Sequence, residues 1–206
     1  MKTADHPAHV PRLCLEGFTT RNLGPLELQV DAGQCLALSG PSGSGKSLLL
    51  RAIADLDPHG GEAFLDGMPC SRLPAPEWRR QVALLAAESP WWLPQVGDHF
   101  CRADPAGLQE LGFGADVLRW QVERLSSGER QRLALLRLLC NGPKVLLLDE
   151  PTANLDPDAT AAVEELVQRY RTAHQAAVLW VSHDPEQVRR VAQRALRIHE
   201  RRLEAA

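Results

Sequence analysis

Short apolar runs separated by amphipathic stretches recur along the chain of 206 residues. Wholly apolar runs occupy positions 35–38, 82–85, 145–148 and 177–181. Runs of this kind predict strands that are buried on both faces, as in a parallel sheet covered by helices. Positions 26–30 instead alternate apolar and polar residues, which is typical of a half-exposed antiparallel strand.

Helix-start signals stand between these runs. Ser126 and Glu129 have capping-box spacing ahead of a leucine-rich stretch that reaches residue 139. The Asp-Pro pairs at 156–157 and 184–185 each place a capping residue before a proline at the first helical position. Strands that alternate with helices predict an α/β fold with a central, mostly parallel sheet, to which the earlier strand adds an N-terminal antiparallel β portion.

The pattern changes after residue 87, where Trp, Pro and Gly become frequent and the predicted helices become short. We therefore predict a single domain over residues 1–206. Its core is expected at 13–87 and 140–206, with a small inserted helical subdomain at about 88–139.

Composition narrows the class of protein without identifying it. The chain is 44% hydrophobic and 24% charged with a net charge of −3, which is ordinary for a globular protein and gives no sign of a nucleic-acid partner. Five cysteines without a C-x-x-C pair favour reduced thiols in the cytosol, where they would serve as small buried hydrophobes. We see no apolar run of membrane-span length and no signal-peptide core, and the polar residues 1–11 predict a loose tail.

The most informative stretch is Gly40–Ser47, which fits the phosphate-binding pattern G-x-x-x-x-G-K-[ST] between a predicted strand and a predicted helix. Gly43 and Gly45 allow a backbone that wraps closely around a phosphate. Lys46 would place a cation on the β- and γ-phosphates, and Ser47 would offer its hydroxyl to Mg²⁺. The predicted nucleotide-binding residues of this stretch are Gly40, Pro41, Ser42, Gly43, Ser44, Gly45, Lys46, Ser47 and Leu48.

Two carboxylates follow the most apolar run of the chain. Asp149 and Glu150 stand at the carboxyl end of the predicted strand 145–148, the end at which α/β sheets bind their ligands. Ionised groups in such a place are costly unless they meet a cation or a reacting group. We expect Asp149 to hold Mg²⁺ and Glu150 to act as general base on an attacking water.

Together these motifs resemble the nucleotide-binding subunit of ABC transporters. The evidence is Walker A at 40–47, the signature Leu-Ser-Ser-Gly-Glu at 125–129, Walker B at 145–150, the D-loop at 153–156 and a histidine, His183, after the last apolar run. Their order and spacing match across about residues 13–200. The short length and the segment Ala-Glu-Ser-Pro-Trp-Trp are similar to small bacterial ABC ATPases related to the iron-export type.

The resemblance implies two cassettes paired head to tail, as a homodimer, with ATP and Mg²⁺ between the P-loop of one and the signature of the other. Ser126, Ser127 and Gly128 would contact the γ-phosphate across that interface, and Asp156 would hydrogen-bond across it. His183 would contact the γ-phosphate and the attacking water. The partner would be an integral membrane permease subunit, so the chain would be cytoplasmic and peripheral on the inner face of the cell membrane.

The chain departs from the family pattern at several positions. The family's Q-loop glutamine is missing, and Glu88 is either a substitute that ligates Mg²⁺ or a solvated surface group. Phe18 is either the aromatic residue that stacks on adenine or a core residue. Trp91 and Trp92 stand where the family contacts the permease, and each is either an interface residue or part of the subdomain core.

Two other functions remain as alternatives. A soluble ABC-type ATPase that acts on nucleic acid or a ribosome usually has two tandem cassettes or a long coiled coil, and this chain has neither and no basic tract. A P-loop kinase for a small metabolite would leave the signature and His183 without a role. We therefore expect an ATPase that powers a membrane transporter and has no nucleic-acid partner.

Overall fold

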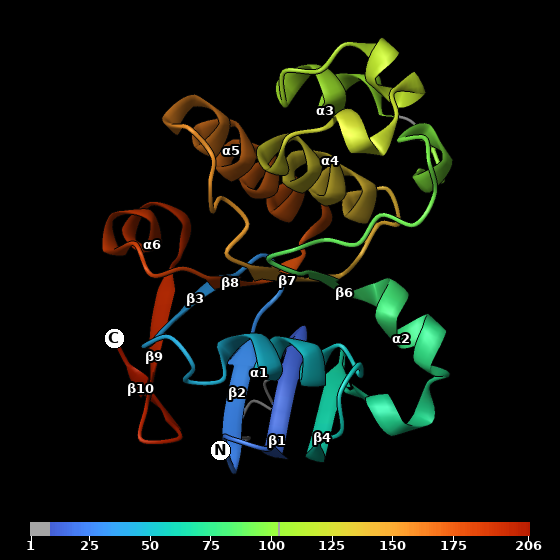
Figure 1. Cartoon of the computed structure of the whole chain (residues 1–206). Helices are drawn as coiled ribbons and strands as arrows, with labels where there is room; N and C mark the ends of the chain where they lie inside the picture. The colour runs from blue at the N-terminus through green and yellow to red at the C-terminus, as the bar shows by residue number, and fades with distance from the viewer. Residues whose placement is uncertain (1–8, 103) are drawn as a thin grey trace, which may run out of the picture.

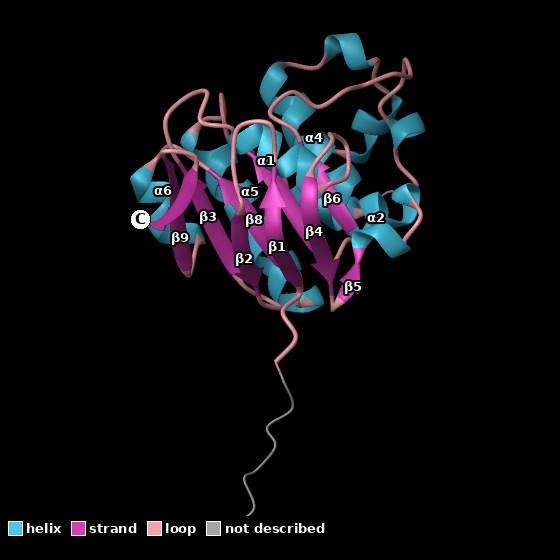
Figure 2. Cartoon of the chain, turned by 90° about the horizontal axis from the view of Figure 1, so that it is seen from below, coloured by secondary structure: helices cyan, strands magenta, loops and turns pink. Residues whose placement is uncertain are grey.

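The computed structural model describes residues 9–102 and 104–206, so most of the predicted tail lies outside the described residues. Two sheets form the frame of the molecule (Figure 1 and Figure 2). The antiparallel sheet has the strand order β2-β1-β4-β5, and the larger sheet has the order β10-β9-β3-β8-β7-β6. In the larger sheet β9, β3, β8, β7 and β6 are parallel, and only β10 at the edge is antiparallel. This architecture confirms the predicted α/β fold.

The strands and helices have the following bounds. The antiparallel sheet consists of β1 (Leu13–Thr19), β2 (Leu26–Val30), β4 (Gly60–Leu65) and β5 (Met68–Pro69). The larger sheet consists of β3 (Cys35–Ser39), β6 (Val82–Leu85), β7 (Val145–Asp149), β8 (Ala177–Val181), β9 (Arg194–His199) and β10 (Arg202–Ala205). The helices are α1 (Lys46–Ile53), α2 (Ala75–Gln81), α3 (Pro105–Glu110), α4 (Ser127–Leu139), α5 (Pro157–His174) and α6 (Pro185–Val191), with short 3₁₀ turns at Cys70–Arg72, Gly97–His99, Ala115–Arg119 and Val122–Arg124.

The predicted burial pattern is confirmed for β2, β3, β7 and β8, whereas Leu84 of β6 is only partly buried because β6 lies at the edge of the sheet. Every residue of β7 and β8 is buried, whereas β2 alternates buried and exposed positions. The reason is visible in Figure 1, where α1 lies between the two sheets and α4 and α5 cover the opposite face of the larger sheet. One buried cluster fills the space around α1, and a second lies between the larger sheet and the layer of α4 and α5.

The stretch before α4 is irregular, with α3 and three 3₁₀ turns. Its apolar residues Leu108, Leu111 and Val117 pack into the same buried cluster as α4 and the larger sheet. The division of the chain into a core and an inserted subdomain stays a prediction. Among the described residues no helix is both long enough and apolar enough to cross a bilayer.

The cysteines are all free thiols, but they do not share one environment. Burial raises the pKa of Cys35 to about 12 and that of Cys70 to about 11, as expected for small core residues. Cys14 is also buried and Cys140 partly so. Cys101 is exposed, so the interpretation of all five as buried hydrophobes is wrong at this position.

Candidate functional site

The P-loop joins β3 to α1. Gly43 has a φ of 77° and Gly45 a φ of 100°, both in the left-handed region that favours glycine. A Cβ on Gly45 would also lie 3.3 Å from side-chain carbons of Leu23, so a larger residue there would require Leu23 to shift by a few tenths of an ångström. Gly45 is the N-cap of α1 and offers no side chain to the helix, whose first turn contains no acidic residue. The free N–H groups of that turn therefore favour an anion.

Two polar side chains of the loop fit a phosphate ligand. The Nζ of Lys46 lies over the loop and donates to the carbonyl oxygens of Gly40 and Pro41 at 2.8 Å and 3.0 Å. The hydroxyl of Ser44 is buried, with no hydrogen-bond partner among the described residues. A buried hydroxyl in this state is costly, and a phosphate oxygen would satisfy it. The exposed residues of the loop and the first turn of α1 are Pro41, Ser42, Gly43, Ser47 and Leu48.

Three predicted site segments meet at one edge of the larger sheet. The P-loop follows β3, His183 follows β8 and Glu150 follows β7, and these three strands are neighbours and parallel. Their carboxyl ends therefore lie together at the edge where α/β sheets bind ligands. Asp149, the last residue of β7, is buried beside them. Its carboxylate and the Ser47 hydroxyl are oxygen donors of the kind that Mg²⁺ prefers.

Glu150 and His183 form a pair. The Oε1 of Glu150 lies 2.9 Å from Nδ1 of His183, and the backbone N–H of Glu150 donates to the carbonyl of Val181 at 3.2 Å. Glu150 adopts a φ of 48°, a left-handed conformation that non-glycine residues adopt at a cost of about 1–3 kcal/mol. Such strain persists only where the surroundings hold it, and it is typical of functional sites.

The signature segment forms the N-terminus of α4. The predicted capping box is present: Ser126 Oγ accepts from the backbone N–H of Glu129 at 3.2 Å, and a Glu129 carboxylate oxygen accepts from the backbone N–H of Ser126 at 2.8 Å. The second of these bonds lowers the pKa of Glu129. A Cβ on Gly128 would lie 2.9 Å from Leu155 Cδ2, so the signature packs directly against the D-loop. Asp156 caps α5, because its side-chain Oδ1 accepts a hydrogen bond from the backbone N–H of Ala159 at 2.8 Å.

The structure corrects the expectation for Phe18. Its side chain is 0% exposed in the core around α1 and stacks on His59, with ring centroids 4.7 Å apart. A ring without an exposed face cannot stack on a nucleotide base, so the core alternative holds for this residue. Its burial depends on the contact with His59, a residue distant in the sequence, which the strand pattern alone does not fix.

A cavity of about 420 Å³ lies next to the P-loop, and three of its lining residues, Pro41, Gly43 and Ser44, were predicted from the sequence. Sequence reasoning missed the others, which come from the β1–β2 connection, the end of β9 and the β9–β10 turn and are Arg21, Asn22, Ile198, His199, Glu200 and Arg201. The turn is tied to the β1–β2 connection because Arg201 Nε donates to the carbonyl of Asn22 at 3.0 Å. No motif marks these residues, since the two segments lie almost 180 positions apart.

A second cavity, of about 510 Å³, lies beside β6 and α4, and Trp92 lines it whereas Glu88 and Trp91 do not. Glu88 is exposed in the turn after β6, and its role as a metal ligand stays a prediction. Trp91 packs partly against the second buried cluster, whereas Trp92 is 67% exposed and lines the cavity. The guanidinium of Arg137 lies over both rings, 4.5 Å and 5.1 Å from their centroids.

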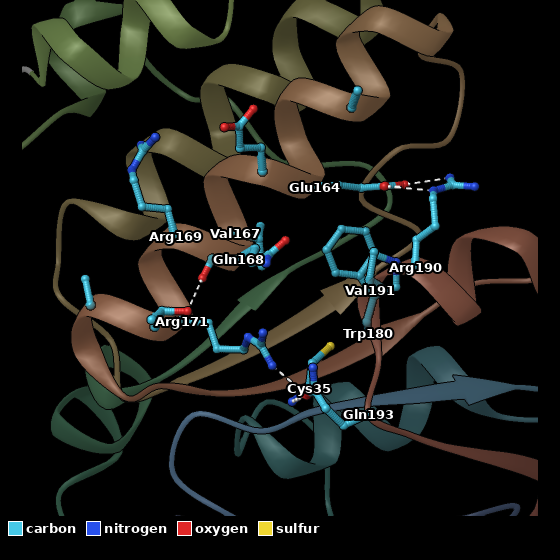
Figure 3. A pocket seen from close by; sticks show the side chains of 14 residues that line it. Cys35, Glu164, Val167, Gln168, Arg169, Arg171, Trp180, Arg190, Val191 and Gln193 are labelled. Atoms are coloured by element: carbon cyan, nitrogen blue, oxygen red, sulfur yellow. Dashed lines mark hydrogen bonds and ion pairs between the residues drawn. The ribbon is translucent and has the colours of Figure 1, made fainter.

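A larger cavity lies elsewhere. It measures about 780 Å³ and opens between α5 and α6, with Arg171, Gln193 and the Glu164–Arg190 ion pair on its walls (Figure 3). No P-loop residue lines it.

Comparisons with known proteins agree with the geometry. The family described as ABC transporter matches residues 23–153. The protein STAR1 of Oryza sativa subsp. japonica is 34% identical over 202 residues, which cover 88% of this chain but only 58% of STAR1. The probable iron export ATP-binding protein FetA of Escherichia coli (strain K12) is 34% identical over 81% of this chain and 80% of its own length.

A solved structure supports the fold. The dimeric post-hydrolysis state of the ATP-binding cassette MJ0796, bound to ADP and Pi, superposes with a TM-score of 0.78 at 22% identity and covers 93% of this chain and 96% of its own. The family match spans the P-loop, the signature and the Walker B strand, which are the segments that build the site. The chain therefore belongs to the ABC transporter family, as one of its ATP-binding and ATP-hydrolysing subunits.

Proposed function

We propose that this subunit powers a transporter whose membrane spans are carried by another chain, and that Glu150 and His183 are its hydrolytic residues. The observation that supports the proposal is their 2.9 Å contact at the sheet edge where the P-loop also ends. In this position Glu150 takes the proton of the attacking water as general base. His183 donates to the carboxylate from Nδ1 and fixes its direction.

The phosphates are held by the P-loop. Lys46 exchanges its two carbonyl contacts for the β- and γ-phosphates, and Ser44 donates its buried hydroxyl. Ser47 and Asp149 would hold Mg²⁺, which would neutralise negative charge on the phosphates. The site is complete only in a head-to-tail pair, where Ser126, Ser127 and Gly128 of a second cassette present the N-terminus of α4 to the γ-phosphate and Asp156 bonds across the interface.

The base of the nucleotide lies in the cavity of about 420 Å³ beside the P-loop. Arg21 there offers a planar guanidinium, which stacks on an aromatic base as a substitute for the absent aromatic residue.

Replacing Arg21 by Ala is expected to raise the Kd for ATP by about 3- to 10-fold. Titration with a fluorescent ATP analogue measures this change, and Arg202→Ala, at an exposed position of β10 that does not line the cavity, is the control. An unchanged Kd for ATP in Arg21→Ala would mean that the base does not stack on Arg21 and binds at another place.

The permease docks at the cavity of about 510 Å³ beside β6 and α4, which places the chain on the inner face of the membrane. Exposed Trp92 is its apolar contact. Arg51 and Arg79 on the cavity wall are paired with Asp57 and Asp55, so Arg137, which lies over the two tryptophan rings, supplies the positive charge. An amphipathic helix that carries an acidic side chain fits this surface.

A tagged pull-down from detergent-solubilised membranes of the native source tests the partner. The intact chain should recover a multi-span membrane protein in stoichiometric amount. Trp92→Ala should lose most of it while its ATP binding is unchanged, and Val10→Ala, which removes another exposed apolar side chain beside Gly67, should lose none. Recovery of ribosomal or nucleic-acid components from the soluble fraction alone would favour the soluble ABC-type alternative.

A further inference from the structure

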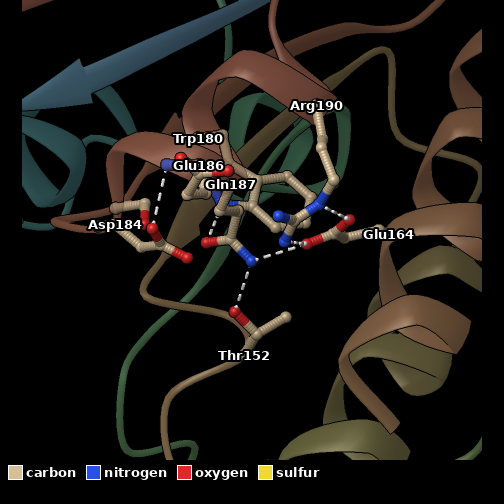
Figure 4. Close-up of polar contacts among 8 residues, drawn as sticks. Thr152, Glu164, Trp180, Asp184, Glu186, Gln187 and Arg190 are labelled. Atoms are coloured by element: carbon tan, nitrogen blue, oxygen red, sulfur yellow. Dashed lines mark hydrogen bonds and ion pairs between the residues drawn. The ribbon is translucent and has the colours of Figure 1, made fainter. Parts of the chain in front are cut away.

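Gln187, on α6, is 4% exposed and its amide is bonded in three directions (Figure 4). Its Nε2 donates to the hydroxyl of Thr152 at 2.8 Å and to a carboxylate oxygen of Glu164 at 2.9 Å. Its Oε1 accepts from the indole N–H of Trp180 at 3.3 Å. Thr152 lies in the connection between β7 and α5, Glu164 lies on α5 and Trp180 lies on β8. A single buried side chain therefore joins α6 to three other segments.

Two of these partners are themselves fixed. Trp180 is fully buried in β8, and the Glu164 carboxylate is held by two bonds from the Arg190 guanidinium, at 2.9 Å and 3.1 Å. A side-chain amide between a fixed donor and a fixed acceptor has one orientation. The remaining N–H of Gln187 therefore points at Thr152, which belongs to neither a helix nor a strand.

Thr152 lies two residues after Glu150, and the residue between them is Pro151, whose ring restricts its own φ. Glu150 is in the left-handed conformation and is anchored on its other side by the bond from its backbone N–H to Val181. The segment that carries the proposed general base is thus held at both ends. Gln187 also lies in the first turn of α6, four residues after His183, so the same side chain restrains the segments of both members of the pair.

We infer that Gln187 is a positioning residue for hydrolysis, which acts through the hydroxyl of Thr152 to keep Glu150 in its strained conformation beside His183. The inference rests on the proposed role of Glu150. Gln187 touches none of the reacting groups, so its loss leaves the P-loop and the binding of ATP intact. The Glu150 carboxylate would instead move away from the attacking water. A small misplacement of a catalytic group lowers the rate by about one to two orders of magnitude.

The test compares Thr152→Val, which removes only the hydroxyl, with Thr152→Ser, which keeps it. Thr152→Val and Gln187→Met should lower kcat by roughly 10- to 100-fold, with the KM for ATP changed by less than about 2-fold. Thr152→Ser should keep most of the kcat, and Arg189→Met, on the exposed face of α6, should match the intact protein. All rates are measured well below the midpoint of thermal unfolding, so that lost stability does not lower them.

Three outcomes are separable. If Glu150→Gln loses turnover while Thr152→Val and Gln187→Met keep it, the positioning role is wrong and the proposed function stands. If Glu150→Gln itself keeps turnover, the proposed role of Glu150 in hydrolysis is wrong, and the inference about Gln187 loses its basis. A parallel loss of ATP binding and of kcat in Thr152→Val would show a general structural role for the hydroxyl instead, and would also overturn the inference. The Thr152 pair decides the question even if Gln187→Met does not fold.

Discussion

ATP hydrolysis should fall by about 10²- to 10⁴-fold when Glu150 is replaced by Gln, while ATP still binds. The amide has the same shape as the carboxylate, and its oxygen can keep the 2.9 Å contact with Nδ1 of His183. It cannot accept a proton from water, so the general-base contribution is lost. Phosphate release under saturating ATP measures the turnover, and a fluorescent ATP analogue measures the binding.

The control for this change is Glu165→Gln, which makes the same substitution at an exposed position of α5. It should hydrolyse ATP like the intact protein. Near-normal turnover in Glu150→Gln would remove the catalytic assignment, whereas a weakened binding of ATP would show that the carboxylate supports the nucleotide site and not only the chemical step.

The largest expected effect on stability is at Trp78. This side chain is 0% exposed on α2, and its indole N–H donates to the carbonyl of Ile53, the last residue of α1, at 2.8 Å. Trp78→Ala should lower the free energy of unfolding by about 3–5 kcal/mol, because it opens a cavity in the core around α1 and leaves that carbonyl without its partner. Urea unfolding followed by circular dichroism measures the change.

The same substitution at Trp92 is the matched control. Trp92 is exposed, and its contacts are with the Arg137 guanidinium and the ring of His99. Its loss should lower the free energy of unfolding by less than about 1 kcal/mol. A loss at Trp78 as small as that expected at Trp92 would mean that α2 is not an essential part of the core.

Much of the fold could be predicted because its signals are local. Apolar runs marked the buried strands, and the capping pattern at Ser126 marked the start of α4, because burial on both faces and helix capping each depend on a few neighbouring residues. The P-loop could be predicted for the same reason, since its spacing fixes its backbone geometry.

The parts that escaped prediction depend on contacts between distant segments. The burial of Phe18 is decided by its stacking on His59, 41 positions further along, and the cavity beside the P-loop depends on the β9–β10 turn. The bond from Gln187 to Thr152 likewise spans 35 positions. No local pattern distinguishes these residues from others of their kind, so only the folded chain reveals them.

The contact between Gly128 and Leu155 has a consequence for how two ATP sites communicate. In the head-to-tail pair proposed above, the signature of each cassette would cover the nucleotide of its partner, while the D-loop beside this signature begins three residues after the cassette's own Glu150. A shift of that carboxylate during turnover would then reach the opposite nucleotide through Leu155. The two sites would not act independently, and the ATP dependence of hydrolysis would be cooperative, with a Hill coefficient above one.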